Sequence, residues 1–321
     1  MSSQCQVFAP WHILMRWIYS FAAVLILTAF ATSAGAQTQA SCQFLKFNRR
    51  LFLNSGHRFL NPEGINDQGT VVGDAYDDVD FTVRGFTRWP DGSITYFRRN
   101  NPETYFLDRT NSGVTVGVTG PAFSLGSGTA TPFFLKDSTF TPFTITIGGQ
   151  TYGGQTYKEF TVRSINKWGT TVGAFTDSSG KVRGFKRFSG GKATALDFPG
   201  AAETVAMAIN DNGTIVGYYS KTASPNLFRH GFIYSNGQWA KLNYPNSMLQ
   251  TELTGISNSN LIVGTTIRGS NATASFLYKN GTFKKIIMPN SNVPTYADGV
   301  SPSKDLITGF SGYTGFIASC K

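Results

Sequence analysis

The stretch Ile209-Asn210-Asp211-Asn212-Gly213-Thr214-Ile215-Val216-Gly217 recurs along this chain, and its recurrence decides the fold. The six copies end at Gly73, Gly117, Gly173, Gly217, Gly264 and Gly309, at intervals of 44, 56, 44, 47 and 45 residues. Each copy contains a predicted turn, near residues 67–69, 111–113, 167–169, 211–213, 258–260 and 303–305. A period of roughly 45 residues accommodates four short strands and their turns. The sequence therefore predicts one four-stranded unit in repeated copies.

A second phrase, centred on phenylalanine, follows each copy of the first. In the fourth copy it is His230-Gly231-Phe232, which leads into Asn236-Gly237. Asn-Gly between alternating apolar residues predicts a hairpin, because a type I′ turn needs a positive φ at both central positions. The other forms are Arg84-Gly85-Phe86, Pro132-Phe133-Phe134, Arg183-Gly184-Phe185, Ser275-Phe276-Leu277 and Gly315-Phe316-Ile317. Each repeat is thus predicted to be an antiparallel meander.

A meander that is apolar on both faces is not stable alone, and twisted copies that stack can close into a ring with few exposed edges. We therefore expect an all-β fold, a six-bladed β-propeller built from four-stranded antiparallel blades. The last repeat stops after its third strand, at residues 315–320, whereas an extra strand at residues 43–47 precedes the first repeat. We expect this N-terminal strand to pair with the last blade and close the ring.

Two cysteines flank the expected closure. When the last repeat is aligned on the fourth, Cys320 falls at the position of Asn236, and Cys42 falls close to that of Gly237. A disulfide at this point would replace the missing turn, and disulfides persist in oxidising compartments. The sequence predicts a disulfide between Cys42 and Cys320.

The N-terminal residues 1–36 resemble a secretory signal, with Arg16 as their only charge, an apolar run over residues 17–30 and small residues up to Ala36. We expect one domain at residues 37–321, secreted or periplasmic, with no membrane span.

That domain has 27 basic and 18 acidic side chains, a net charge of +9. Its lysines and arginines are scattered, so we expect a monomer with a solvated surface and no nucleic-acid partner.

The pairing of an Ile-Asn-x-x-Gly-x-x-Val-Gly phrase with His230-Gly231-Phe232 resembles the HAF-repeat family of bacterial extracellular proteins, named for a His-Ala-Phe triplet. The resemblance extends over the six copies. Only the fourth keeps the histidine, and Gly231 stands in place of alanine. The resemblance implies an exported repeat protein and supplies no catalytic residues.

Three glutamates recur at one offset from the repeat turns. Glu103, Glu159 and Glu203 each lie ten residues before the turn glycine of their repeat. If the first strand of each blade lines the central channel, these carboxylates would gather at one mouth, where they would bind a ligand. Two of them would also suffice as the acid and base of a glycosidase. The alternative, that these are solvated glutamates at strand ends without a ligand, stays open.

Two other candidate sites lie in loops. Four aspartates after the second strand of the first repeat offer oxygen ligands for calcium, although their spacing lacks the glycine and glutamate of a known calcium loop; they are Asp74, Asp77, Asp78 and Asp80. The 56-residue interval contains Gly-Gly-Gln-Thr-Tyr twice in succession, ending at Tyr152 and Tyr157. We expect a rim hairpin there, whose tyrosines are candidate ligand contacts.

No constellation of a hydrolase or metalloenzyme accompanies the repeats. His57 and His230 are the only histidines after residue 36, and there is no Gly-x-Ser-x-Gly phrase. We expect an exported binding or structural module without a cofactor, calcium being the one candidate, whose ligand is a glycan, a cell-wall component or a protein. The alternative is a carbohydrate-active hydrolase or lyase that uses the channel-mouth carboxylates.

Overall fold

The computed structural model describes residues 38–48, 50–52, 57–97, 103–120, 129, 131–154, 160–222, 228–247, 250–268 and 272–321. The predicted signal at residues 1–36 lies outside them. The described residues form strands and turns without a helix. In this part of the chain there is accordingly no helix that is long and apolar enough to cross a membrane.

Four sheets stand as separate blades. One contains β2 (Arg50–Phe52), β3 (His57–Ile65), β4 (Val71–Asp77), β5 (Val83–Arg88) and β6 (Ile94–Phe97). The next contains β7 (Glu103–Arg109), β8 (Thr115–Gly120), β9 (Thr131–Lys136) and β10 (Thr139–Pro142). Another contains β21 (Gln250–Ile256), β22 (Ile262–Arg268), β23 (Ala272–Lys279) and β24 (Thr282–Ile286). The last combines β25 (Thr295–Val300), β26 (Leu306–Ser311) and β27 (Thr314–Cys320) with β1 (Cys42–Asn48).

The third and fourth repeats share one eight-stranded sheet, so the pairing does not separate six blades as expected. Its first half contains β13 (Phe160–Ile165), β14 (Thr171–Thr176), β15 (Val182–Arg187) and β16 (Ala193–Leu196). Its second half contains β17 (Glu203–Ile209), β18 (Ile215–Ser220), β19 (His230–Ser235) and β20 (Gln238–Lys241). The halves are joined by one parallel pair, Val182 with Glu203. Sequence periodicity does not reveal such a bridge, because it depends on how closely neighbouring meanders approach.

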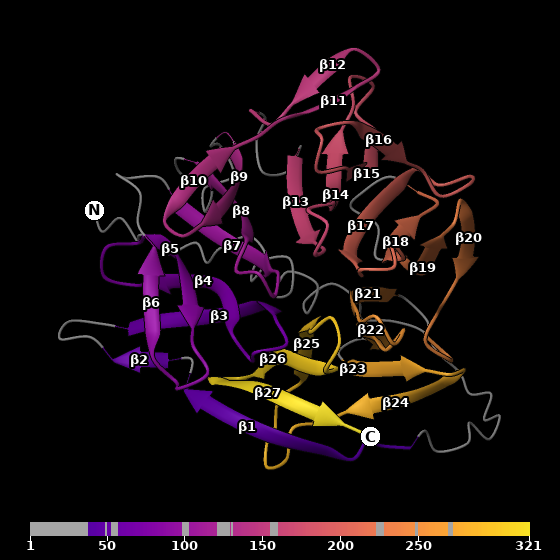
Figure 1. Ribbon diagram of the computed structural model, residues 1–321. Coiled ribbons are helices and arrows are strands. Elements are labelled where there is room, and N and C mark those ends of the chain that lie inside the picture. The colour runs from indigo at the N-terminus through magenta and orange to yellow at the C-terminus, as the bar shows by residue number, and fades with distance from the viewer. Residues whose placement is uncertain are drawn as a thin grey trace, which may run out of the picture.

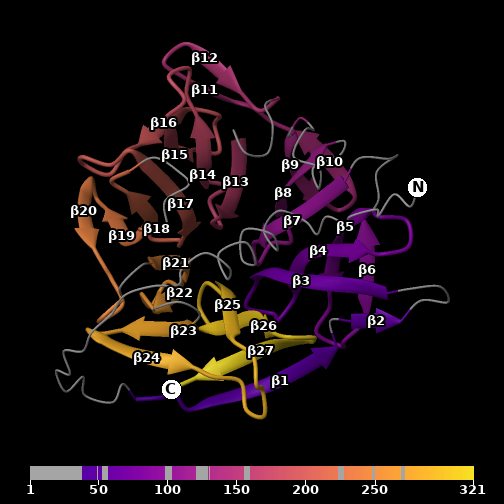
Figure 2. The same ribbon diagram turned by 180° about the vertical axis from the view of Figure 1, so that it is seen from behind.

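The sheets form a closed ring, a β-propeller (Figure 1). The first strands of the repeats contact one another in the order β3, β7, β13, β17, β21, β25, and β25 contacts β3. Seen from behind, the hairpin of β11 (Ile145–Ile147) and β12 (Gln150–Tyr152) projects from the rim (Figure 2). This hairpin accounts for part of the long interval between the second and third repeats.

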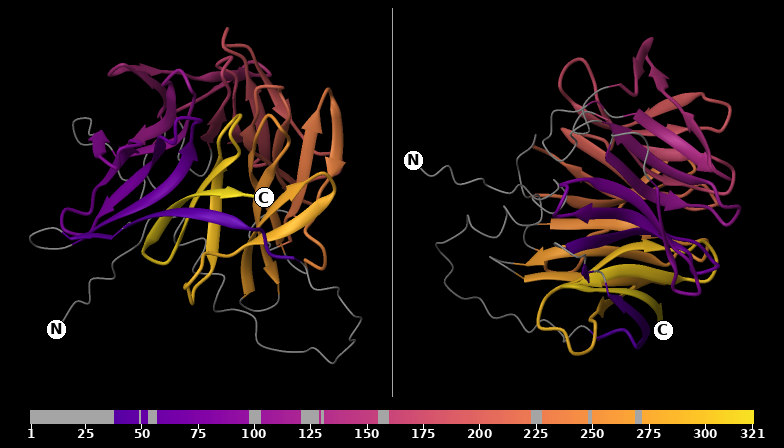
Figure 3. Two further views of the ribbon diagram at one scale, coloured as in Figure 1. Left: turned by 60° about the horizontal axis from the view of Figure 1, so that its bottom comes forward. Right: turned by 90° about the vertical axis from the view of Figure 1, so that its left-hand side faces the viewer.

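The predicted closure is confirmed. Strand β1 pairs antiparallel with β27, Cys42 lies opposite Cys320, and the two cysteines form a disulfide across 278 residues of sequence. In Figure 3 the indigo β1 runs along the yellow sheet. Just before β1, Ala40 donates a backbone hydrogen bond to Lys285 O of β24. The segment from residue 38 to β2 therefore contacts three consecutive sheets, and we call it the N-terminal belt.

The two repeated phrases meet in the folded chain. In every repeat the final glycine of the first phrase lies opposite the phenylalanine of the second, as Gly217 lies opposite Phe232. These phenylalanines are fully buried, and they are Phe86, Phe133, Phe185, Phe232, Phe276 and Phe316. The phrases therefore recur because they form the inner core of each meander.

The turns follow the predicted chemistry. Asn236-Gly237 and Asn280-Gly281 each have two successive positive φ angles, near 50° and 80°. Buried strands such as β18 lie near the axis, whereas the fourth strand β20 is largely exposed. This gradient places the firmly packed residues around the ring axis.

Candidate functional site

A β-bulge at one repeated position presents a side chain from every first strand to a common space. In β17 the antiparallel register shifts between Ala206 and Ala208, which leaves Met207 as the extra residue. A bulged residue is unpaired, and its side chain is aimed away from the regular alternation. The extra residues of the first strands are Glu63, Leu107, Arg163, Met207, Thr254 and Asp298. All of them line one cavity of about 60 Å³, which we call the axial channel.

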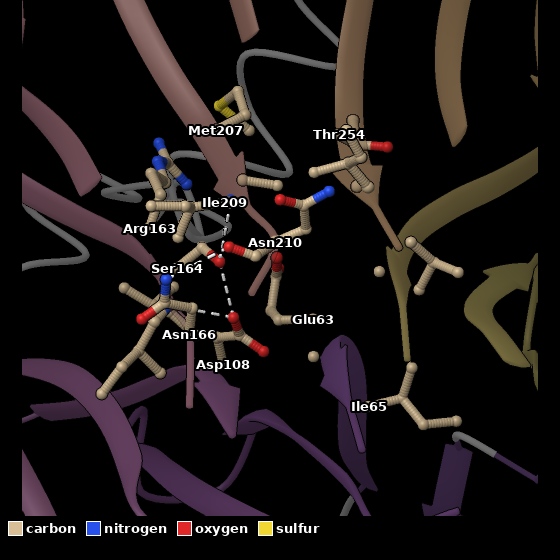
Figure 4. A pocket seen from close by; sticks show the side chains of 18 of the residues that line it. Glu63, Ile65, Asp108, Arg163, Ser164, Asn166, Met207, Ile209, Asn210 and Thr254 are labelled. Atoms are coloured by element: carbon tan, nitrogen blue, oxygen red, sulfur yellow. Dashed lines mark hydrogen bonds between the residues drawn. The ribbon is translucent and has the colours of Figure 1, made fainter. Parts of the chain in front are cut away.

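The extra residues of the bulges place carboxylates on one side of the axial channel and a guanidinium on the other. Glu63 and Asp298 belong to β3 and β25, which contact each other. Arg163 belongs to β13, on the opposite side of the ring from β25. Figure 4 shows Glu63, Arg163, Met207 and Thr254 around the same space. Equivalent positions of the repeated fold therefore carry different chemistry.

Asp108, the residue after the bulge in β7, links three first strands. Its carboxylate accepts hydrogen bonds from Ser164 Oγ at 2.6 Å, Ile165 N at 3.0 Å and Arg109 N at 2.8 Å. Ser164 Oγ in turn accepts a hydrogen bond from Ile209 N at 3.3 Å (Figure 4). Burial raises the pKa of Asp108, although these hydrogen bonds favour the charged form.

Asp108 differs from the residues at the same position of the other repeats, and it does not share the offset of Glu103, Glu159 and Glu203. The equivalent positions in the other repeats are occupied by glycine, alanine or serine, namely Gly64, Ser164, Ala208, Gly255 and Gly299. A Cβ at Gly64 would lie 2.7 Å from Asp108 Cα, which explains the need for a small residue there. Asp108 is therefore the one acidic residue at a position where the other five repeats have a small residue.

The turns between first and second strands form a second ring, the turn ring, at residues 66–69, 110–113, 166–169, 210–213, 257–260 and 301–305. In three repeats an asparagine side chain links the turn to the next one. Asn210 Nδ2 donates to Ser257 O at 2.9 Å, while Asn210 Oδ1 accepts from Thr214 N in its own turn. Asn166 and Asn66 make the same links, to Asn210 O and Thr110 O. The conserved spacing of the phrase thus orders one turn against the next.

Asp67 closes the turn ring between its last and first members. Asp67 Oδ1 accepts hydrogen bonds from Ser303 N at 2.8 Å and Lys304 N at 2.9 Å, and Oδ2 accepts one from Asn111 Nδ2 at 2.6 Å. Burial alone would favour the neutral acid, but the hydrogen bonds outweigh it and hold the pKa of Asp67 below its usual range.

We expect Asp67→Ala to lower the free energy of unfolding at pH 7 by about 2 kcal/mol, because backbone donors lose a charged acceptor. A lowered folded-state pKa contributes stability above the unfolded value of about 4, and this contribution is lost as pH falls through the folded pKa. Urea unfolding of wild type and variant at pH 7 and pH 3 tests this. A difference in stability that is the same at both pH values would contradict it.

The glutamates predicted to gather at one channel mouth have separate surroundings. Glu103 begins β7 and accepts a hydrogen bond from Tyr105 Oη at 3.2 Å. Glu203 begins β17 and interacts electrostatically with Arg229 and Glu252. Glu159 lies outside the described residues. The gathering of all three carboxylates therefore stays a prediction.

A charged cluster that the sequence did not predict surrounds Glu203. Arg229 pairs with Glu252 on β21, and its guanidinium lies 4.5 Å from the centroid of the Tyr218 ring. Burial raises the pKa of Glu203, opposed by Arg229 and reinforced by Glu252. Arg229 directly precedes the second phrase, and Glu252 does not share the offset of the three glutamates. The repeat pattern therefore does not predict their pairing.

Of the two tyrosines predicted to contact a ligand, one is described. Tyr152 on β12 is buried, its ring centroid lies 4.6 Å from that of Phe175, and its hydroxyl donates to Gln150 Oε1 at 2.8 Å. Tyr152 therefore packs the hairpin onto the sheet. Tyr157 lies outside the described residues.

The four aspartates predicted to bind calcium do not gather into a site. Asp77 accepts hydrogen bonds from Arg58 and Arg84, and Asp80 also pairs with Arg84. Asp74 accepts a hydrogen bond from Asn61 Nδ2 at 2.8 Å. Across the described residues, no group of three or more His, Cys, Asp or Glu side chains is placed to hold a metal ion. Arginines pair with Asp77 and Asp80, and calcium binding by the four aspartates stays a prediction.

Comparison with known proteins supports the fold. A sequence profile described as "Protein of unknown function (DUF3466)" matches residues 196–318. No curated protein matches the chain. A solved structure provisionally named gluconolactonase is 11% identical with a TM-score of 0.50, covering 90% of this chain and 93% of its own.

Two TolB structures are also similar. TolB from Acinetobacter baumannii is 10% identical with a TM-score of 0.53, covering 78% of this chain and 63% of its own. A structure provisionally named TolB from Agrobacterium tumefaciens is 9% identical with a TM-score of 0.53, covering 88% and 99%. At these identities the likeness concerns the fold alone, and the chain has the all-β propeller fold that these structures share.

Proposed function

We propose that this protein is a six-bladed propeller of the HAF-repeat type that works outside the cytoplasm as a monomeric, non-enzymatic binding module. Each half of the eight-stranded sheet has its own copy of both phrases, and one residue pair joins the halves, which supports counting them as two blades. The disulfide between Cys42 and Cys320 supports an oxidising location.

The axial channel supports a ligand that presents a primary amine, as a peptide or the peptide part of a cell-wall polymer does. Glu63 and Asp298 offer carboxylates on one side, and Arg163 would receive a ligand carboxylate or carbonyl on the other. The free space is about 60 Å³, and one water molecule needs only ~10–15 Å³ by this measure. An ammonium group therefore fits this space.

Isothermal titration calorimetry with lysine-containing tripeptides tests the proposal. We expect Glu63→Gln and Asp298→Asn each to weaken binding about tenfold or more, the size expected of a hydrogen bond to a charged group. Met207→Leu is the matched control, since it keeps the volume and removes no charge. Acetylation of the lysine amine is expected to abolish binding.

Two results would overturn this proposal. One is tripeptide binding that is equal in the wild type and in both carboxylate variants. The other is turnover of a glycan from a panel of polysaccharides, lost in Glu203→Gln. That outcome would favour the alternative of a carbohydrate-active hydrolase or lyase, for which the raised pKa of Glu203 beside Glu252 is the supporting observation.

A further inference from the structure

The turn ring is interrupted at one junction. In the first, third and fourth repeats an asparagine amide reaches a carbonyl of the next turn, through Asn66, Asn166 and Asn210. The second, fifth and sixth repeats have Thr110, Ser257 and Ser301 at this position, and these side chains have no amide to donate. The fifth and sixth turns are linked onward by other bonds, from Asn258 N to Pro302 O and from Ser303 N to Asp67 Oδ1. The Thr110 hydroxyl instead accepts from Val114 N and contacts Ser112 Oγ at 3.0 Å, both within its own turn. Between these two fully described turns, 110–113 and 166–169, no hydrogen bond is formed.

A cleft of about 310 Å³ occupies this junction, separate from the axial channel. Small-molecule sites span roughly 300–1,000 Å³, so the cleft is at the lower end of that range. Its lining comes from the two facing turns and from β9 and the end of β15. The junction without a hydrogen bond thus coincides with an opening of a size that suits a small ligand.

Trp168 forms an exposed wall of the cleft. Its side chain is 62% exposed, unusual for so large an apolar residue. The indole is held in place, because Nε1 donates to Asp211 O at 2.9 Å, and Lys167 Nζ lies 4.7 Å from the ring centroid. A fixed, exposed indole provides a flat surface for the apolar face of a ligand.

The charges that line the cleft are all positive. Lys167 and Arg187 line it, and no Asp or Glu does so in the described part of the chain. The Arg187 guanidinium carbon lies 4.7 Å from the centroid of Phe143, and its buried Nε has no hydrogen-bond partner. Hydroxyls of Ser112 and Ser189 complete the polar lining. The cleft therefore combines an indole, hydroxyls and two cations.

We infer that this cleft binds a carboxylated sugar unit of an acidic polysaccharide. The sugar ring packs against Trp168, its hydroxyls bond to Ser112 and Ser189, and its carboxylate pairs with Arg187 and Lys167. Arginine binds carboxylates through two parallel hydrogen bonds, which suits a planar uronate group. The inference does not rest on the amine site in the axial channel, which involves other residues.

The binding test measures, by calorimetry with the full chain, the affinity for tetragalacturonate and for a neutral malto-oligosaccharide of equal length. We expect tetragalacturonate to bind and the neutral sugar to bind at least about tenfold more weakly, because it lacks the charge-assisted contacts. Trp168→Ala is expected to abolish binding, whereas Trp89→Phe, at a turn that does not line the cleft, leaves it unchanged. Equal affinity for both sugars, or competition by inorganic phosphate at the same concentration, would overturn the inference.

A second variant tests the origin of the cleft. Thr110→Asn supplies the missing amide, which we expect to bond to Asn166 O as Asn166 bonds to Asn210 O. The variant is expected to fold with unchanged or higher thermal stability. Because the added bond between the two turns leaves less room for the sugar to reach Arg187 and Lys167, we expect tetragalacturonate to bind at least about tenfold more weakly. A folded Thr110→Asn protein that keeps full affinity would contradict the assigned position of the ligand.

Discussion

Replacing both Cys42 and Cys320 with serine is expected to lower the free energy of unfolding by about 5 kcal/mol, the largest effect of any change considered for this protein. The chain-entropy estimate grows with the length of the closed loop, and this loop spans 278 residues. The variant should still fold, since β1 remains paired with β27 over seven residue pairs. Guanidinium unfolding at pH 7 under non-reducing conditions measures the difference.

Dithiothreitol provides the control for the cysteine variant. Reduced wild type and the double serine variant should unfold at the same denaturant concentration, because both lack the bond. A stability of the variant within about 1 kcal/mol of the oxidised wild type would show that the disulfide adds little beyond the strand pairing, contrary to the loop-closure argument.

Gly217→Ala is expected to destabilise the protein by about 3 kcal/mol or more, at the upper end for added volume in a packed core. A Cβ at Gly217 would lie 2.0 Å from Val205 O and 3.0 Å from Met207 N. These are backbone atoms of the bulge, so they cannot move aside as a flexible side chain would. The substitution must therefore push the bulge that presents Met207 to the axial channel.

Gly190→Ala is the matched control, because a Cβ there meets nothing within 4 Å and no left-handed φ is required. We expect its effect to be within about 0.5 kcal/mol, as for most exposed substitutions. Thermal unfolding of both variants by circular dichroism makes the comparison. Equal melting temperatures would refute the steric explanation for the glycine that ends each copy of the first phrase.

The repeats and the closure were predictable because both depend on local sequence. Asn-Gly at positions 236–237 predicts its own turn. The extra strand at residues 43–47 matches the fourth strand that the last repeat lacks. The bridge between Val182 and Glu203 was not predictable, since it depends on the approach of two meanders. Nor was the bulge, because one extra residue in β17 does not alter the spacing of the phrase.

The candidate site was predicted less well, for a physical reason. Glu103, Glu159 and Glu203 share one offset in their repeats, but a ligand site on a repeated scaffold depends on where the repeats differ. Asp108 among small residues is such a difference, and so is Thr110, where three other repeats have asparagine. The chemistry of Arg163 became visible only when the bulge placed it opposite Asp298.

The N-terminal belt has a consequence for the order of folding. Strand β1 leaves the ribosome first among the strands, yet its partner β27 is synthesised last, 278 residues later for the cysteine pair. Blades in the middle of the chain can collapse as they emerge, whereas β1 has no partner until β27 is synthesised. The ring is thus closed only after the whole domain has been synthesised.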